Sequence, residues 1–113
     1  MKILTAKEEE IMYIIWRKGP IFVKDILPLC KGRHFNTIST IVRSLEQKGY
    51  LSHKVFGNTY QYYAMINEEE YCRNILMNII NQYFDKSWLK AISYMIKEGK
   101  ITEQEFNVLI DGM

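Results

Sequence analysis

The side chains with the most informative chemistry lie in a stretch of residues 36–47. Apolar residues recur there at helical spacing, which predicts a helix with one buried face. The apolar positions are Ile38, Ile41, Val42 and Leu45, and the opposite face holds Asn36, Thr40, Arg43 and Gln47, flanked by Ser39 and Ser44. The side chains of this opposite face are polar and mostly short. The face lacks the regular series of Glu and Lys that is typical of a helix side exposed only to solvent.

The polar face has the chemistry of a helix that lies in the major groove of DNA. Short hydroxyl and amide side chains and arginine form hydrogen bonds with base edges, and asparagine can pair with adenine. The candidate base-reading residues are therefore Asn36, Thr37, Ser39, Thr40 and Arg43. An ordinary solvated helix face with few charges would show a similar pattern, so both interpretations stay open on the pattern alone.

Residues suited to catalysis or metal binding are scarce. The two histidines, His34 and His53, are expected in a turn and on a hairpin, and no carboxylate can be placed beside either. There is no glycine-rich phosphate loop, metal-ligand spacing or nucleophile motif. Cys30 and Cys72 lack C-x-x-C spacing, which argues against a disulfide scaffold or a zinc site. We expect no catalytic residue, no metal and no cofactor.

The composition is that of a small globular protein. Of 113 residues, 48% are hydrophobic and 25% are charged, which suits one domain or a domain with an appendage. The longest apolar run covers residues 11–16, far short of the roughly 20 residues that cross a membrane. Charged residues precede that run, which argues against a signal peptide. We therefore expect no membrane insertion and a cytoplasmic location.

Charge divides the chain into two parts. Residues 1–66 carry ten Lys and Arg against five Asp and Glu, whereas residues 67–113 carry five against eight. The first part is therefore net positive and the second net negative. A basic part suits contact with a polyanion such as nucleic acid, and an acidic part does not.

Two helices are expected before the polar-faced one. The first begins at a capping box, Thr5-x-x-Glu8, and ends at Gly19-Pro20. Trp16 lies on its apolar stripe and is expected to be buried. Residues 21–22 are expected to form an extended link, and residues 23–30 a short helix with a proline inside it.

A β-hairpin is expected after residue 49. Residues 50–56 and 59–65 are rich in aromatic and β-branched side chains, and the turn pair Gly57-Asn58 separates them. Three helices followed by such a hairpin, or wing, form the winged helix-turn-helix arrangement, in which the third helix enters the major groove. Polar residues of the wing and of the helix ends would then contact phosphates, and the candidates are Arg33, Lys48, Lys54, Asn58 and Thr59.

Residues 67–113 are expected to form helices without a core of their own. Capping signatures at Asn67 and Thr102 open two of them, and the first runs to about residue 85. Because these helices have too little chain to form a separate core, their apolar stripes favour a homodimer interface. Packing back onto the first domain within a monomer is the alternative. The expected interface residues are Ile75, Leu76, Ile79, Ile80, Tyr83, Trp88, Ile92, Met95, Phe106 and Leu109.

The expected fold class is mainly α with a small β-hairpin. We expect a winged helix-turn-helix DNA-binding domain over residues 1–66 and a C-terminal helical dimerisation region over residues 67–113.

Three motifs together are similar to a known family. They are Leu4-Thr5-x-x-Glu8-x-Glu10-Ile11-Met12 with Ile15-Trp16; Thr37-Ile38-x-Thr40-Ile41-Val42-x-x-Leu45-x-x-Lys48-Gly49-Tyr50-Leu51; and His53-Lys54 with Tyr60-Gln61-Tyr62-Tyr63. In that order, they resemble the first helix, the recognition helix with its exit into the wing, and the wing strands of the penicillinase and methicillin-resistance repressors (the BlaI/MecI/CopY-type family). The resemblance covers nearly the whole chain.

This resemblance implies a homodimeric winged-helix repressor that acts on an operator dyad. In the family, residues at the positions of Asn36, Thr37, Ser39 and Thr40 contact DNA. A membrane sensor-protease system lifts repression by triggering cleavage in the C-terminal region, and the cleaved Asn-Phe pair aligns by spacing with Tyr94-Met95. The implied partners are therefore double-stranded operator DNA, a second copy of the chain and a membrane-bound sensor protease.

A winged helix that binds protein instead of DNA is the alternative function. Such a module would present an acidic or apolar recognition face. Here the corresponding face carries Asn36, Thr40, Arg43 and Gln47, which favours DNA.

Overall fold

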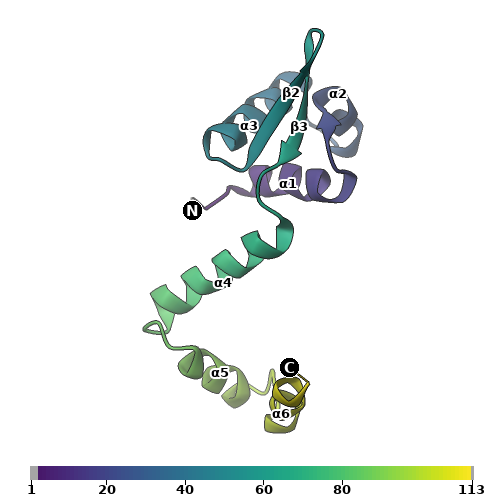
Figure 1. Ribbon diagram of the computed structural model, residues 1–113. Coiled ribbons are helices and arrows are strands. Elements are labelled where there is room, and N and C mark those ends of the chain that lie inside the picture. Colours follow the sequence, from purple (N-terminus) through teal and green to yellow (C-terminus); the bar gives the residue numbers. More distant parts are fainter. Residues whose placement is uncertain (1–2, 113) are drawn as a thin grey trace. The chain divides into compact units, whose positions relative to one another are not determined.

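A computed structural model describes residues 3–112 of the chain (Figure 1). It consists of two compact units, one ending at Cys72 and one beginning at Arg73. The predicted fold class is confirmed, because helices dominate and the β-hairpin after the third helix belongs to a small antiparallel sheet, as in a winged helix domain.

Helix α1 (Ala6–Lys18) begins and ends as the sequence predicts. Thr5 Oγ1 accepts a hydrogen bond from the Glu8 amide, and the Glu8 carboxylate accepts one from the Thr5 amide, so the capping box is complete. Gly19 ends the helix with a φ of 79°, a left-handed conformation that glycine adopts without steric cost. Trp16 is half-buried, and its Nε1 donates to the Ile66 carbonyl at 2.7 Å.

The segment between α1 and the third helix differs from the expected single helix over residues 23–30. Helix α2 (Val23–Ile26) is one turn long, and a 3-10 turn, η1 (Leu27–Leu29), follows it. Pro28 lies in the first turn of η1, where its missing N–H leaves no hydrogen bond unmade. Proline therefore ends the α-helix and begins a tighter turn.

The predicted hairpin is part of a three-stranded antiparallel sheet. Strands β2 (Leu51–Phe56) and β3 (Thr59–Ala64) pair along their whole length, with Phe56 opposite Thr59 at the turn. Residues 21–22, expected to be an extended link, form strand β1 (Ile21–Phe22), which pairs with β3 and gives the order β1-β3-β2. The sequence prediction missed this strand because two residues are too few to show a period.

The core of the first unit lies between α1, helix α3 (Phe35–Gln47) and the sheet. Its apolar side chains are the periodic ones predicted from the sequence, and Cys30 packs among them as a small apolar residue. The completely buried set includes Ile11, Met12, Ile26, Ile38, Val42, Leu45 and Tyr50. The buried stripe of α3 therefore directs its opposite face to solvent.

The carboxylate of Glu8 is the charged group buried in this core. Its side chain is 4% exposed. Lys48 Nζ donates to both carboxylate oxygens at 2.8 Å, and Ser44 Oγ donates to Oε2 at 3.0 Å. Burial by itself would raise the pKa of Glu8, but the hydrogen bonds from Lys48, the Thr5 amide and Ser44 lower it to about 2. Glu8 thus joins the start of α1 to the last turns of α3.

The first turn of helix α4 (Glu68–Tyr83) belongs to the first unit. The side chain of Tyr71 is 1% exposed, and its hydroxyl donates a hydrogen bond to Glu9 Oε2. The centre of its ring lies 5.4 Å from the ring centre of Trp16 and 5.8 Å from that of Tyr50. Burial and the Glu9 hydrogen bond raise the pKa of Tyr71. These contacts explain why this unit extends to Cys72, beyond the division that we expected at residue 66.

The second unit holds the rest of α4 with helices α5 (Trp88–Lys97) and α6 (Glu103–Asp111). Ser87 caps α5, and a complete capping box at Thr102 opens α6. Helix α4 ends at Tyr83, slightly before the expected residue 85, because Asp85 and Lys86 adopt positive φ values of 50° and 62°. Neither α5 nor α6 contains a fully buried residue.

Within residues 3–112, no helix is both long enough and apolar enough to span a membrane.

The Glu8 cluster gives a stability prediction. Because the pKa of folded Glu8 (about 2) is below its ordinary value of 4.5, the ionised carboxylate stabilises the fold above pH 4.5 and loses this effect as the pH falls toward 2. Glu8→Gln should lower the free energy of unfolding at pH 7 by about 3 kcal/mol, and by much less at pH 3. Urea denaturation at fixed protein concentration measures both values.

Glu98→Gln is the matched control, because Glu98 is exposed at the end of α5. This variant should unfold like the wild type at both pH values. Equal stability of Glu8→Gln and the wild type at pH 7 would contradict the role assigned to the buried carboxylate.

Candidate nucleic-acid interface

The five predicted base-reading residues all lie on α3, between its second and its ninth residue. Asn36, Thr40 and Arg43 are exposed, whereas Thr37 and Ser39 are half-buried. The buried stripe on the other side of the helix fixes this orientation, because its three central residues have no exposed surface. The polar face of α3 is therefore a continuous solvent-facing surface.

The side chain of Arg43 extends along this face, back toward the start of the helix. Its Nε donates to the Ser39 carbonyl at 3.2 Å, and its Nη2 approaches Thr40 Oγ1 at 3.5 Å. Thr40 Oγ1 in turn donates to the Asn36 carbonyl at 2.9 Å. A guanidinium has five N–H donors, so these contacts orient Arg43 and leave donors for a bidentate acceptor such as a guanine edge.

A cleft of about 460 Å³ separates α3 from the wing and from the start of α2. It brings together parts of both predicted groups, since Ser39 and Arg43 from α3 line it with Asn58 and Thr59 from the wing tip. The complete lining is Val23, Lys24, Phe35, Ser39, Arg43, Asn58, Thr59, Tyr60 and Tyr62. Two cationic side chains therefore border a groove that also has aromatic walls.

Lys24 and Tyr60 are cleft residues that sequence reasoning missed. Lys24 is exposed in the single turn of α2, and its Nζ lies 5.8 Å from the centre of the Phe22 ring. A lysine at the start of the second helix of a helix-turn-helix is the signal that was available for it. Tyr60 belongs to the aromatic-rich second strand of the hairpin, and its side chain is 47% exposed.

Lys54 lies on the sheet face opposite α3. Successive side chains of a strand alternate between faces, and the neighbouring His53 contacts α3. Lys54 is exposed and lines a separate hollow of about 750 Å³ with Gln61 and Tyr63. Among the predicted phosphate-binding residues, Lys54 is therefore separated from the cleft by the thickness of the sheet.

The two remaining predicted phosphate-binding residues are held by carboxylates. Arg33 Nη2 lies 2.7 Å from Glu10 Oε2, and this hydrogen bond lowers the pKa of Glu10. Lys48 is the partner of buried Glu8. Their charges are therefore largely neutralised within the domain, which the sequence did not indicate because the partners lie 23 and 40 positions away.

His53 has a carboxylate partner, contrary to the sequence-based expectation. Its Nδ1 lies 2.6 Å from Glu46 Oε1, which links strand β2 to the last turns of α3. The imidazole also stacks on Tyr60, with ring centres 4.2 Å apart and an angle of 20° between the planes. The pair was missed because the partners belong to different elements, although only seven positions separate them.

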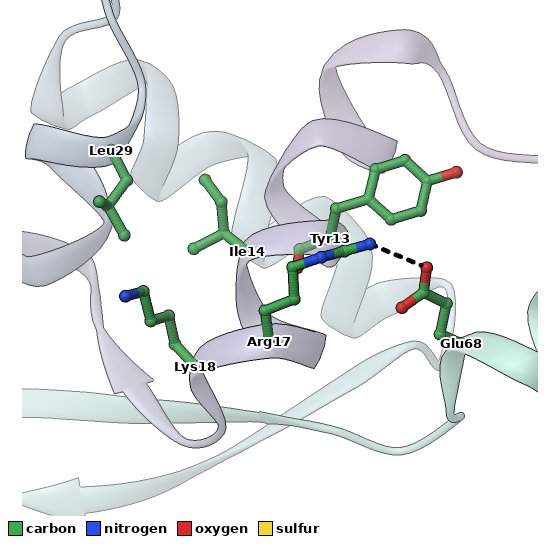
Figure 2. Close-up of a pocket in the computed structure, with 6 residues that line it drawn as sticks. All are labelled: Tyr13, Ile14, Arg17, Lys18, Leu29 and Glu68. Atoms are coloured by element: carbon green, nitrogen blue, oxygen red, sulfur yellow. Dashed lines mark hydrogen bonds and ion pairs between the residues drawn. The ribbon is translucent and has the colours of Figure 1, made fainter.

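A different hollow lies on the outer side of α1 (Figure 2). Arg17 donates to the Tyr13 carbonyl at 3.1 Å and to Glu68 Oε2 at 3.3 Å, and Figure 2 shows its guanidinium directed at that carboxylate. Ile14 and Leu29 form the apolar side. This hollow contains no Ser, Cys or His nucleophile, and no group of three or more metal-ligating side chains occurs within residues 3–112.

The sequence of residues 4–113 matches the penicillinase repressor family. The chain belongs to the penicillinase repressor family. Members of this family are DNA-binding transcriptional repressors rather than enzymes. This assigns the winged helix domain, with the exposed polar face of α3, to a regulator of transcription.

Individual relatives of this family member are distant in sequence. The methicillin resistance regulatory protein MecI of Staphylococcus aureus (strain N315) is 23% identical over 109 residues, which cover 94% of this chain and 89% of the relative. The MecI protein of Mammaliicoccus sciuri is 22% identical over 109 residues, which again cover 94% of this chain and 89% of the relative. An uncharacterized 16.5 kDa protein of Latilactobacillus sakei is 28% identical over 105 residues, covering 90% of this chain and 72% of that protein.

Proposed function

We propose that this penicillinase repressor family member is a homodimer that represses transcription by binding an operator dyad. The observation that carries the proposal is the shared cleft, in which Ser39 and Arg43 of α3, the wing tip and Lys24 line one groove. A helix in the major groove and a wing on the adjacent backbone would use these groups together. Family membership supports the same function.

Base reading is proposed for Asn36, Thr37, Ser39, Thr40 and Arg43. Arginine pairs with guanine through two hydrogen bonds, asparagine pairs with adenine, and hydroxyls contact several bases. Arg43 is the strongest candidate, because its contacts with Ser39 and Thr40 hold it along the exposed face before DNA binds.

Phosphate binding is proposed for two sets of residues. Asn58 and Thr59 at the wing tip, with Lys24 across the cleft, suit the backbone beside the major groove. Lys54 would contact a strand on the outer face of the wing. Arg33 and Lys48 have a smaller role in this proposal, because their carboxylate partners already offset their charges.

Dimerisation is proposed for the apolar surface of the second unit. Leu76, Ile79 and Tyr83 on α4 are 48%, 42% and 70% exposed. Three further interface residues are also exposed, namely Trp88, Met95 and Leu109. Three others are half-buried, namely Ile75, Ile92 and Phe106. Ile80 is 3% exposed within the single chain and thus acts as a support for this surface. Apolar surface of this extent suits an isologous dimer.

Proteolytic release by a membrane-bound sensor protease is retained as part of the proposal. The Tyr94–Met95 bond lies inside α5, whereas a protease requires an extended backbone. Because α5 has no fully buried residue within one chain, local opening of this helix would cost little free energy in a protomer whose dimer contacts are released. The bond is therefore in a segment suited to regulated cleavage.

Operator binding is tested by fluorescence anisotropy. The probe is duplex DNA from upstream of the protein's own gene, with random duplex as the control. A dimer with about 6–10 phosphate contacts should lose roughly 10³–10⁵ in affinity between about 50 and 200 mM salt while still preferring its own promoter. Weak binding without preference would instead favour the protein-interaction module.

The same titration separates base contacts from phosphate contacts. Arg43→Ala should weaken binding to the promoter by about 1–3 kcal/mol and change binding to random DNA little. Lys54→Ala is the matched comparison, because it should weaken both alike and reduce the salt slope by about one. If Arg43→Ala weakens binding to both duplexes equally, Arg43 is no base reader.

The dimer is tested by light scattering after gel filtration. Ile79→Glu puts a charge into the proposed interface and should convert the dimer to a monomer that binds a half-site only. Asn81→Glu is the control, since Asn81 is exposed two positions further along α4 and faces the other way. Equal masses for Ile79→Glu and the wild type would exclude this interface.

A further inference from the structure

A row of three side chains connects the recognition helix to the wing. Glu46 lies in the last turns of α3, His53 on β2 and Tyr60 on β3. His53 Nδ1 lies within hydrogen-bond distance of Glu46 Oε1, at 2.6 Å. The imidazole also stacks on the ring of Tyr60, with ring centres 4.2 Å apart. The imidazole is thus held on both sides, and it joins the two elements that the proposed function brings to DNA.

The hydrogen bond fixes one proton of the imidazole and leaves the other free to exchange. An ionised carboxylate only accepts, so Nδ1 carries a hydrogen and donates it to Glu46 Oε1. When Nε2 is protonated as well, the ring becomes cationic and the contact becomes an ion pair. Imidazole side chains ordinarily change charge between pH 5 and 8, where Glu and Lys do not.

Groups from three elements surround the imidazole of His53. From α3, the facing charges are Glu46 and, further along, Arg43, both of which act on the adjacent Tyr62. From β3, the facing groups are the neutral phenols of Tyr60 and Tyr62, at 4.2 and 5.7 Å between ring centres. On β2 itself, Lys54 points to the opposite face of the sheet. The nearest charge is therefore a carboxylate.

The wing residue that His53 supports is itself part of the cleft. Tyr60 lines the cleft with Arg43 from α3 and with Asn58 and Thr59 from the wing tip. Tyr60 pairs with Val55 in the hairpin, two positions from His53. A tighter contact between His53 and Glu46 therefore limits the motion, relative to α3, of the part of the wing that carries Tyr60.

We propose that His53 is a positioning residue that fastens the wing to α3 through Glu46, so that protonation of the imidazole tightens DNA binding. The inference rests on the proposed function for its readout on DNA. Its physical content, a wing that is better ordered when His53 is charged, is measurable without DNA.

The first test is a pH profile of promoter affinity at constant ionic strength. The wild type should bind about three-fold more tightly at pH 6 than at pH 8, the size expected for one partly exposed ion pair. His53→Asn keeps a donor near the Nδ1 position but cannot titrate, and Glu46→Gln removes the anion, so both should abolish the pH dependence. Thermal melts at both pH values check that the variants fold.

His34→Asn is the matched control. His34 is the other histidine of the chain, is exposed, and precedes α3 without a side-chain cap hydrogen bond. This variant should keep the pH dependence of the wild type. A flat wild-type profile, or an unchanged profile in His53→Asn, overturns the proposal.

The second test uses NMR relaxation of the hairpin backbone in the free protein. In the wild type, residues 54–59 should be more ordered at pH 6 than at pH 8, and in His53→Asn they should be equally ordered at both. If the chain binds no promoter at any pH, the proposed function fails and this test alone decides. A hairpin whose order is independent of pH overturns the role of His53.

Discussion

The structure of the first unit depends on one buried carboxylate. Glu8 completes the capping box of α1, and it also accepts hydrogen bonds from Ser44 of α3 and from Lys48 at the end of α3, 36 and 40 positions away. A buried charge is tolerated only when every lone pair has a partner, so this arrangement permits few orientations of α1 against α3. Because that orientation buries the apolar stripe of α3, it also determines which residues of the helix face solvent. Glu8 thus acts on the proposed DNA surface without contacting it.

The same electrostatics decide which basic residues remain for a polyanion. The positive balance of residues 1–66 counts every Lys and Arg equally, but Lys48 and Arg33 have their charges offset by Glu8 and Glu10. Lys24 and Arg43 instead border the cleft between α3 and the wing. A basic sequence therefore overstates the area of positive surface and does not indicate its position, which follows from the ion pairs that folding forms.

Features with local causes could be predicted from the sequence. The capping boxes at Thr5 and Thr102, the stripe of α3 and the Gly57-Asn58 turn depend on neighbours within a few residues, and the structure confirms each of them. Contacts between distant elements could not be predicted. Strand β1 exists because β3 supplies its partner, and His53 has a carboxylate because β2 returns beside α3. The roles of the predicted interface residues stay predictions, because contact with DNA is not a local property.

The contrast between the two units shows how local and tertiary requirements separate. In the first unit, cap and burial agree in α1, which has a complete capping box and also buries its apolar side. In the second unit, α5 and α6 are capped as well, yet side chains such as Leu89 and Val108 are 79% and 72% exposed. Capping contributes only about 1 kcal/mol per helix end, too little to hold short helices in water. In the proposed dimer, a symmetric second copy would supply the apolar burial that these helices lack within one chain. Dimer formation would then order these helices, so the folding of the second unit and the pairing of two DNA-binding units would be one concentration-dependent equilibrium.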